Sequence, residues 1–188
     1  QRRLCNRRRC GKYRRNIELG RPFFRKIHYR IFGRRRSGFG GRNQKANVDE
    51  TELIRSFVLC SDASIDGGQD IGDPTEVALV VLGDKFNLEK NTLNAEYKRV
   101  GENPFDSDRK LMSTLNEEGN KFRVHTKGAI DNILMRSNRI LVNGEILPIT
   151  DEAKAKILKV AENMSDDALR VLGVAFKDVD TDIAPEEM

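Results

Sequence analysis

The chain contains few of the residue groupings that do chemistry on their own. Neither a GxxxxGK[ST] nor a GxGxxG sequence occurs, so the two standard glycine-rich phosphate-binding loops are absent. The two histidines, His28 and His125, suggest no catalytic triad, and His125 beside Lys127 in a strand-like run is interpreted as structural. The three cysteines form no CxxC pair, which argues against a disulfide framework and a zinc site.

Four short segments stand out because each places polar or aromatic side chains at a helix or strand boundary. They are residues 72–76 (GDPTE), 104–112 (PFDSDRKLM), 126–129 (TKGA) and 169–172 (LRVL). In the first, Asp73 suits a helix N-cap, Pro74 suits N1, and Glu76 stands at the N3 position of a capping box. In the last, Arg170 interrupts an apolar run, which is costly unless its guanidinium reaches a partner.

The order and distances of these four segments resemble the nucleotide-binding domain of P-type ATPases, most closely the calcium-pump-like subgroup. The resemblance covers about residues 49–178. A single Lys-Gly-Ala or Asp-Pro-Thr-Glu is a weak signal, whereas all four segments in this order are a strong one. The mixture of helices and hairpins predicts an α/β (α+β) fold. The resemblance implies a twisted, largely antiparallel sheet flanked by helices.

The resemblance also implies which residues hold the adenine of ATP. Glu76 would accept a hydrogen bond from the adenine amino group, which is compatible with a place in a capping box. Phe105 would stack on the adenine face, where base–aromatic contacts contribute about 1–3 kcal/mol. Without the neighbouring Lys110, Phe105 would be equally well interpreted as a core aromatic at a strand entrance. Met112 would line the floor of the pocket, or be a plain core residue.

The remaining implied binding residues lie along the nucleotide. Lys127, next to Gly128 and Ala129, would stand at the edge of the adenosine pocket, and Lys110 nearer the phosphates. Gly128 has no Cβ and would let backbone and base approach closely. Arg170 would contact the phosphates through its fork of donors. Without the resemblance, both lysines are interpreted as solvated strand ends.

No catalytic residue and no metal ligand is expected in this chain. The family's phosphorylated aspartate lies in a DKTGT motif, which is absent here, as are the downstream magnesium-binding aspartates. We therefore expect the chain to hold ATP and deliver it to a separate phosphorylation domain. Its expected partners are ATP and the phosphorylation and actuator domains of the same parent, an ATP-driven, calcium-transporting pump that uses Mg²⁺.

The chain has no run of about 18 apolar residues, so none of it is expected to span a membrane. The resemblance implies a cytoplasmic domain of an integral membrane protein, without direct membrane contact of its own.

Charge divides the chain into two parts. Residues 1–45 carry 17 Lys/Arg and one Glu, whereas residues 46–188 carry 17 Lys/Arg and 28 Asp/Glu. We predict a basic N-terminal segment over 1–47 and a nucleotide-binding domain over 48–188. The basic arm keeps two alternatives open: a nucleic-acid-binding protein whose arm contacts phosphates and bases, and an interaction domain with a polybasic, membrane-surface arm. The four ordered segments favour nucleotide binding, with no nucleic acid as partner.

Local patterns predict the elements that would position these residues. Helices are predicted over about 49–60, 73–86, 130–135 and 151–166, and strands over 97–101, 109–115, 122–126, 139–142, 145–149 and 169–176. Residues 116–120 are predicted to form a hairpin loop, and Asn143-Gly144 to form a type I′ turn. The nearly continuous apolar run over 169–176 predicts a central strand.

Overall fold

The computed structural model describes residues 46–188, so the predictions for the basic arm over 1–45 fall outside the described part of the chain. The α-helices are α1 (Val48–Leu59), α2 (Pro74–Lys85), α3 (Lys90–Glu96), α4 (Ile130–Arg136) and α5 (Asp151–Asp166). The strands are β1 (Ser64–Asp66), β2 (Gln69–Ile71), β3 (Arg99–Asp106), β4 (Leu111–Glu118), β5 (Lys121–Gly128), β6 (Arg139–Val142), β7 (Glu145–Pro148) and β8 (Gly173–Val179). A short 3₁₀ turn, Pro185–Glu187, follows β8.

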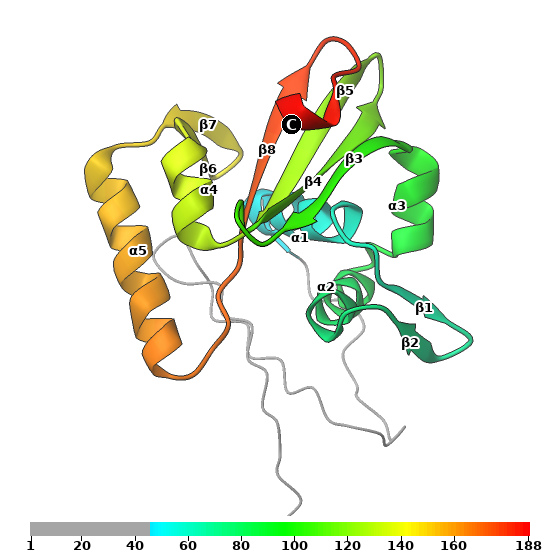
Figure 1. Cartoon of the computed structure of the whole chain (residues 1–188), viewed down its shortest axis with the longest axis horizontal. Coiled ribbons are helices and arrows are strands. Elements are labelled where there is room, and N and C mark those ends of the chain that lie inside the picture. Colours follow the sequence, from blue (N-terminus) through cyan, green and yellow to red (C-terminus); the bar gives the residue numbers. More distant parts are fainter. Residues whose placement is uncertain (1–45) are drawn as a thin grey trace, which may run out of the picture.

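A four-stranded antiparallel sheet with the order β3-β4-β5-β8 forms the centre of the molecule. Two small antiparallel hairpins, β1–β2 and β6–β7, stand apart from it. Figure 1 shows α4, α5 and β6–β7 gathered beside β8, with α2, α3 and β1–β2 on the other side of the molecule. The predicted mixed fold with a largely antiparallel sheet is confirmed.

Helix α1 lies against the sheet and connects it to α2 and α3 (Figure 1). The Nδ1 of His125 in β5 lies 3.1 Å from the Ser56 hydroxyl, and Cys60 Sγ donates to the Met112 carbonyl of β4 at 3.4 Å. A second layer of the core joins α1 to α2 and α3 through the buried residues Ile54, Val58, Leu59, Leu82, Phe86 and Leu93. None of the helices described is long and apolar enough to cross a membrane.

Most local signals lead to the predicted elements. Thr150 caps α5 by accepting from the Ala153 N–H at 3.2 Å, as expected. Asn143 and Gly144 both have positive φ, 53° and 82°, which confirms the two-residue turn between β6 and β7. The loop predicted over residues 116–120 is shorter than expected, because β4 continues to Glu118 and β5 starts at Lys121.

The predicted central strand over residues 169–176 is wrong in both its start and its position. Strand β8 begins at Gly173, and in the described sheet it pairs with β5 alone, at an edge. The apolar side chains before Gly173 belong to the connection from α5, where they are half-buried and outside the sheet. Helix α3 and the β1–β2 hairpin were not predicted.

Candidate functional site

One row of residues crosses all four strands of the sheet and marks the end where the candidate residues gather. Asp106 of β3 pairs with Leu111 of β4, Leu111 pairs with Gly128 of β5, and Gly128 pairs with Gly173 of β8. We call this end of the sheet the Gly128 end. The antiparallel arrangement alternates strand starts and strand ends here, so it collects residues from distant parts of the sequence.

Phe105 and Lys110 flank the tight connection between β3 and β4. Phe105 is 63% exposed, although it is a large apolar side chain at the end of a strand. The Oδ1 of Asp106 accepts from the N–H groups of Asp108 and Arg109, which fixes the turn. Lys110 is exposed and has φ 56°, a left-handed conformation that turns the chain into β4. An aromatic face and a cation are therefore both accessible at this end.

Gly128 permits a close backbone approach at the end of β5. A Cβ added to it would lie 2.1 Å from the Lys110 carbonyl oxygen, so a side chain here would displace the β3–β4 connection. The Ala129 N–H donates to that same carbonyl at 3.1 Å, and Ala129 is the N-cap residue of α4. Gly128 thus lets β5 approach the backbone of Lys110 closely. This contact joins the segment over 126–129 to the segment over 104–112.

Glu76 at the start of α2 does not complete the capping box that its position predicts. The cap is Asp73, whose carboxylate accepts from the Thr75 N–H at 2.7 Å, a hydrogen bond that lowers the pKa of Asp73. Glu76 instead accepts through Oε2 from the N–H groups of Asp62 and Ala63, at 2.7 and 3.0 Å. It points away from its own helix N-terminus because the chain after α1 passes beside it.

Lys127 is not a solvated strand end. Its side chain is buried, and its Nζ donates to Glu76 Oε1 at 2.6 Å, to the Cys60 carbonyl, and towards Met112 Sδ at 3.1 Å. Met112 faces Lys127 across the β4–β5 ladder and is 2% exposed, so it is a core residue in this structure. The buried ion pair between Glu76 and Lys127 joins α2 to β5.

Arg170 lies before β8 and not inside it, so no apolar strand is interrupted. Its side chain is exposed, and its Nη1 lies 3.5 Å from the Thr75 hydroxyl at the start of α2. Thr75 and Arg170 are 95 positions apart in the sequence. The fourth segment therefore meets the first beside the Gly128 end.

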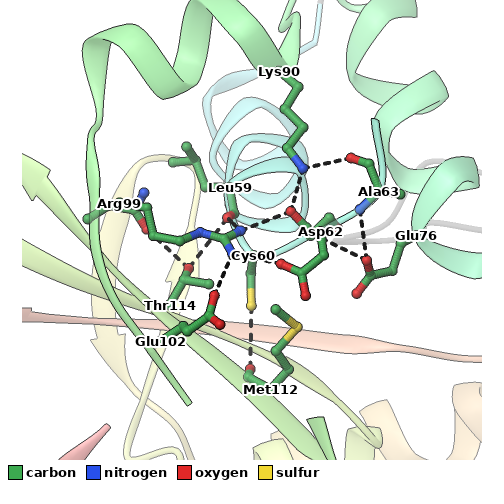
Figure 2. A network of polar contacts seen from close by, with 12 residues as sticks. Leu59, Cys60, Asp62, Ala63, Glu76, Lys90, Arg99, Glu102, Met112 and Thr114 are labelled. Carbon is green, nitrogen blue, oxygen red and sulfur yellow. Dashed lines mark hydrogen bonds and ion pairs between the residues drawn. The ribbon is translucent and has the colours of Figure 1, made fainter. Parts of the chain in front are cut away.

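Two cations that sequence reasoning missed bind the chain between α1 and β1. Arg99 of β3 donates to the Leu59 and Ser61 carbonyls at 2.8 and 2.9 Å, and to the Asp62 carboxylate at 2.7 Å. Lys90 of α3 donates to the Ser61 and Ala63 carbonyls, both at 2.6 Å. Figure 2 shows both side chains converging on this segment, with Glu76 at its other side. Helix α3 has only seven residues and no side-chain cap, so no sequence signal revealed Lys90.

Two titratable groups of the nearby core, Cys60 and His125, are buried, and burial favours their neutral forms. Burial raises the pKa of the Cys60 thiol. Burial, with the charges of Arg55 and Arg123, lowers the pKa of His125 to about 3. Over residues 46–188 there is no group of three or more His, Cys, Asp or Glu residues placed to hold a metal ion.

Comparison with known proteins gives a family match and similar relatives. The family described as P-type ATPase, cytoplasmic domain N, matches residues 49–188. A calcium-transporting ATPase of Bacillus cereus is 48% identical over 125 residues, which are 66% of this chain and 14% of that protein. Similar proteins of Listeria monocytogenes and Lactococcus lactis are 42% and 40% identical over 71% and 70% of this chain, and 15% of each relative. The chain thus spans about one seventh of the length of these relatives.

Proposed function

We propose that this chain, which belongs to the P-type ATPase cytoplasmic domain N family, binds ATP at the Gly128 end of its sheet. The observation that carries the proposal is the meeting of all four segments at this end. Register joins Leu111 to Gly128 and Gly173, a buried ion pair joins Glu76 to Lys127, and Arg170 reaches Thr75. A site built from such distant segments needs no glycine-rich loop.

Phe105 is the proposed platform for the adenine ring. A core aromatic would be buried, whereas this one is 63% exposed beside a fixed turn. An exposed aromatic on a rigid strand stacks on a base at low entropic cost, because its backbone is already ordered. Its exposure therefore supports base stacking over a core role.

Glu76 is the proposed acceptor for the adenine amino group. A carboxylate offers about four acceptor positions, and the described residues use three of them, from Asp62, Ala63 and Lys127. One position is left for a ligand, and 15% of the side chain is exposed. Since a carboxylate can only accept, it favours a 6-amino purine over a 6-oxo purine.

The exposed cations Lys110 and Arg170 are the proposed contacts of the phosphates. Each lies on a connection at the Gly128 end, and neither is held in an ion pair among the described residues. Lys127 is placed differently, because Glu76 and the Cys60 carbonyl already engage its ammonium group. We therefore assign Lys127 to the wall of the adenine site, together with Gly128 and Ala129, while Met112 packs behind Lys127 in the core.

The role of the chain within a larger parent protein is a separate part of the proposal. We propose that the chain is the ATP-holding part of a membrane-embedded, calcium-transporting pump, in which the phosphorylation and actuator domains of the parent are its partners and Mg²⁺ accompanies ATP. The support is the identity to calcium-transporting ATPases. Phosphoryl transfer would take place on the parent's phosphorylation domain, since the chain contains no DKTGT sequence.

Replacement of Phe105 by Ala tests the site. We expect ATP, ADP and AMP all to bind about 5-fold to 150-fold more weakly, which corresponds to about 1–3 kcal/mol of lost stacking. Stability should change by no more than about 0.5 kcal/mol, because the ring is exposed. Binding is measured by NMR titration, with wild-type dissociation constants of about 0.1–5 mM, since the acidic residues over 46–188 oppose the phosphates.

Val100→Ala is the matched control, because Val100 is an exposed apolar residue on the same strand. It should leave the affinity for all three nucleotides unchanged. Unaltered ATP binding by the Phe105→Ala variant would contradict the proposed site, and so would a loss of stability typical of a buried aromatic.

A further inference from the structure

The short segment Ser61–Asp62–Ala63, which leaves the end of α1, is held from two sides by opposite charges. On one side its N–H groups, from Asp62 and Ala63, donate to Oε2 of Glu76. On the other side its carbonyls, from Ser61 and Ala63, accept from Nζ of Lys90. Figure 2 shows Ala63 between Lys90 and Glu76, with dashed lines from its oxygen to Lys90 and from its nitrogen to Glu76.

The peptide unit between Ser61 and Asp62 connects the two charges directly. Its oxygen accepts from Lys90 at 2.6 Å and its N–H donates to Glu76 at 2.7 Å. The peptide dipole thus points its positive end at the carboxylate and its negative end at the ammonium, which strengthens both charge-assisted hydrogen bonds. Lys90 and Glu76 are therefore linked through one peptide unit, without a hydrogen bond between their side chains.

The start of α2 is packed tightly against the same segment. A Cβ on Gly72, which directly precedes the cap residue Asp73, would lie 2.8 Å from Ala63 Cα. A shift of Ala63 would consequently move both the amides that hold Glu76 and the backbone that enters its helix. Lys90 is half-buried here, and burial together with the charge of Arg99 lowers its pKa.

We propose that Lys90 is a positioning residue for adenine recognition, which fixes the Glu76 carboxylate through the Ser61–Ala63 backbone. The inference rests on the proposed function, in which Glu76 accepts from the adenine amino group. Arg99 supports the same segment but is divided among Leu59, Ser61, Asp62 and Glu102. Lys90 binds the carbonyls on both sides of the two amides that hold Glu76, so its loss acts on Glu76 most directly.

The test measures the ratio of the dissociation constants for ITP and ATP, which differ at position 6 of the purine. Lys90→Met keeps the aliphatic stem and removes the donors. We expect it to lower the affinity for ATP about threefold to tenfold and to leave the affinity for ITP unchanged, because the charge-assisted hydrogen bond between Glu76 and the adenine amino group becomes weaker. Lys90→Arg, which keeps the donors, should restore the ratio towards the wild-type value. Lys98→Met is the matched control, an exposed lysine just after the same helix.

Glu76→Gln separates the inference from the function on which it rests. In wild type ATP should bind more tightly than ITP, Glu76→Gln should abolish this preference, and Lys90→Met added to Glu76→Gln should not change the ratio further. If wild type does not distinguish the nucleotides, adenine recognition by Glu76 fails and the inference fails with it. If Glu76→Gln abolishes the preference but Lys90→Met keeps it, the proposed function stands and the inference is overturned. Equal weakening of ATP and ITP by Lys90→Met would show a purely structural role and overturn it too.

Discussion

Cations and aromatic rings occur at both ends of the central sheet, but they are paired with other groups at one end and exposed at the other. At the end where Glu118 pairs with Lys121, which we call the Glu118 end, Arg55 and Arg123 are paired with carboxylates. Their guanidinium groups also lie over aromatic rings, Arg55 at 4.7 Å from the centroid of Tyr97 and Arg123 at 4.5 Å from that of Phe176. At the Gly128 end, Phe105 is left uncovered beside Lys110.

The difference separates charges that stabilise the fold from the charges that we propose contact the nucleotide. At the Glu118 end, the carboxylates of Glu52, Glu118 and Asp178 neutralise the cations of the same chain. A cation that already stacks on a ring and binds carboxylates has few free N–H donors and little uncompensated charge with which to bind a nucleotide. At the Gly128 end, the aromatic face and the exposed cations remain available, and the buried Glu76–Lys127 pair retains one acceptor position.

The largest effect is expected from Lys127→Met at the Gly128 end. Removal of the cation leaves the Glu76 carboxylate partly buried without its ionic partner and the Cys60 carbonyl without a donor. We expect a loss of about 3–5 kcal/mol in the free energy of unfolding, measured with urea, together with weaker ATP binding. Lys121→Met, which removes an exposed ion pair with Asp180, is the control and should cost less than about 1 kcal/mol. A comparably small loss for Lys127→Met would mean that the pair is not buried in solution.

Arg123→Met should affect the Glu118 end in a different way. Arg123 is bound to Glu52, Glu118 and Asp178, so its loss should lower the free energy of unfolding by about 1.5–3 kcal/mol. ATP affinity, measured at a temperature where the variant is folded, should equal that of wild type. Weaker ATP binding in the folded variant would erase the proposed distinction between the two ends.

His125, buried between these ends, should give the smallest of the three effects, as a dependence of stability on pH. Its folded pKa of about 3 lies below the ordinary value of 6.5, so the unfolded chain binds the proton more readily. The contribution of His125 to the free energy of unfolding is therefore fully present above pH 6.5, and it is lost as the pH falls towards 3. We expect a loss of about 1.4 kcal/mol between pH 7.5 and 5.5, measured by urea unfolding at both values.

His125→Gln provides the matched comparison, since an amide can keep the contact with Ser56 but does not titrate in this range. The variant should lose less stability than wild type over the same pH interval, by the amount attributed to His125. Identical pH dependence of the two proteins would show that the imidazole is not held neutral in the folded state.

Helix starts and turns were predictable from the sequence because their chemistry is local. Thr150 accepts from an N–H three positions later, and the Asn143-Gly144 pair favours the positive φ that its turn requires. The carboxylate of the distant Asp49 also accepts from both N–H groups of this turn, which the sequence did not predict. The four segments also identified the residues that meet at the Gly128 end, since their order along the chain is a property of the sequence. The resemblance carried this prediction, because no segment alone specifies a ligand.

Only the tertiary structure decided the environment of each of these residues. Lys127 and the Cys60 carbonyl that it binds are 67 positions apart, so its burial cannot be deduced from its neighbours in β5. Glu76 leaves its expected capping position because the segment after α1 offers two amides, and this segment is held in turn by Lys90 from a helix of seven residues. Likewise, the apolar run before Gly173 looks like a central strand, but the register of β5 and β8 places it outside the sheet. Hydrogen bonding and desolvation depend on which groups are in contact, and the fold determines these contacts.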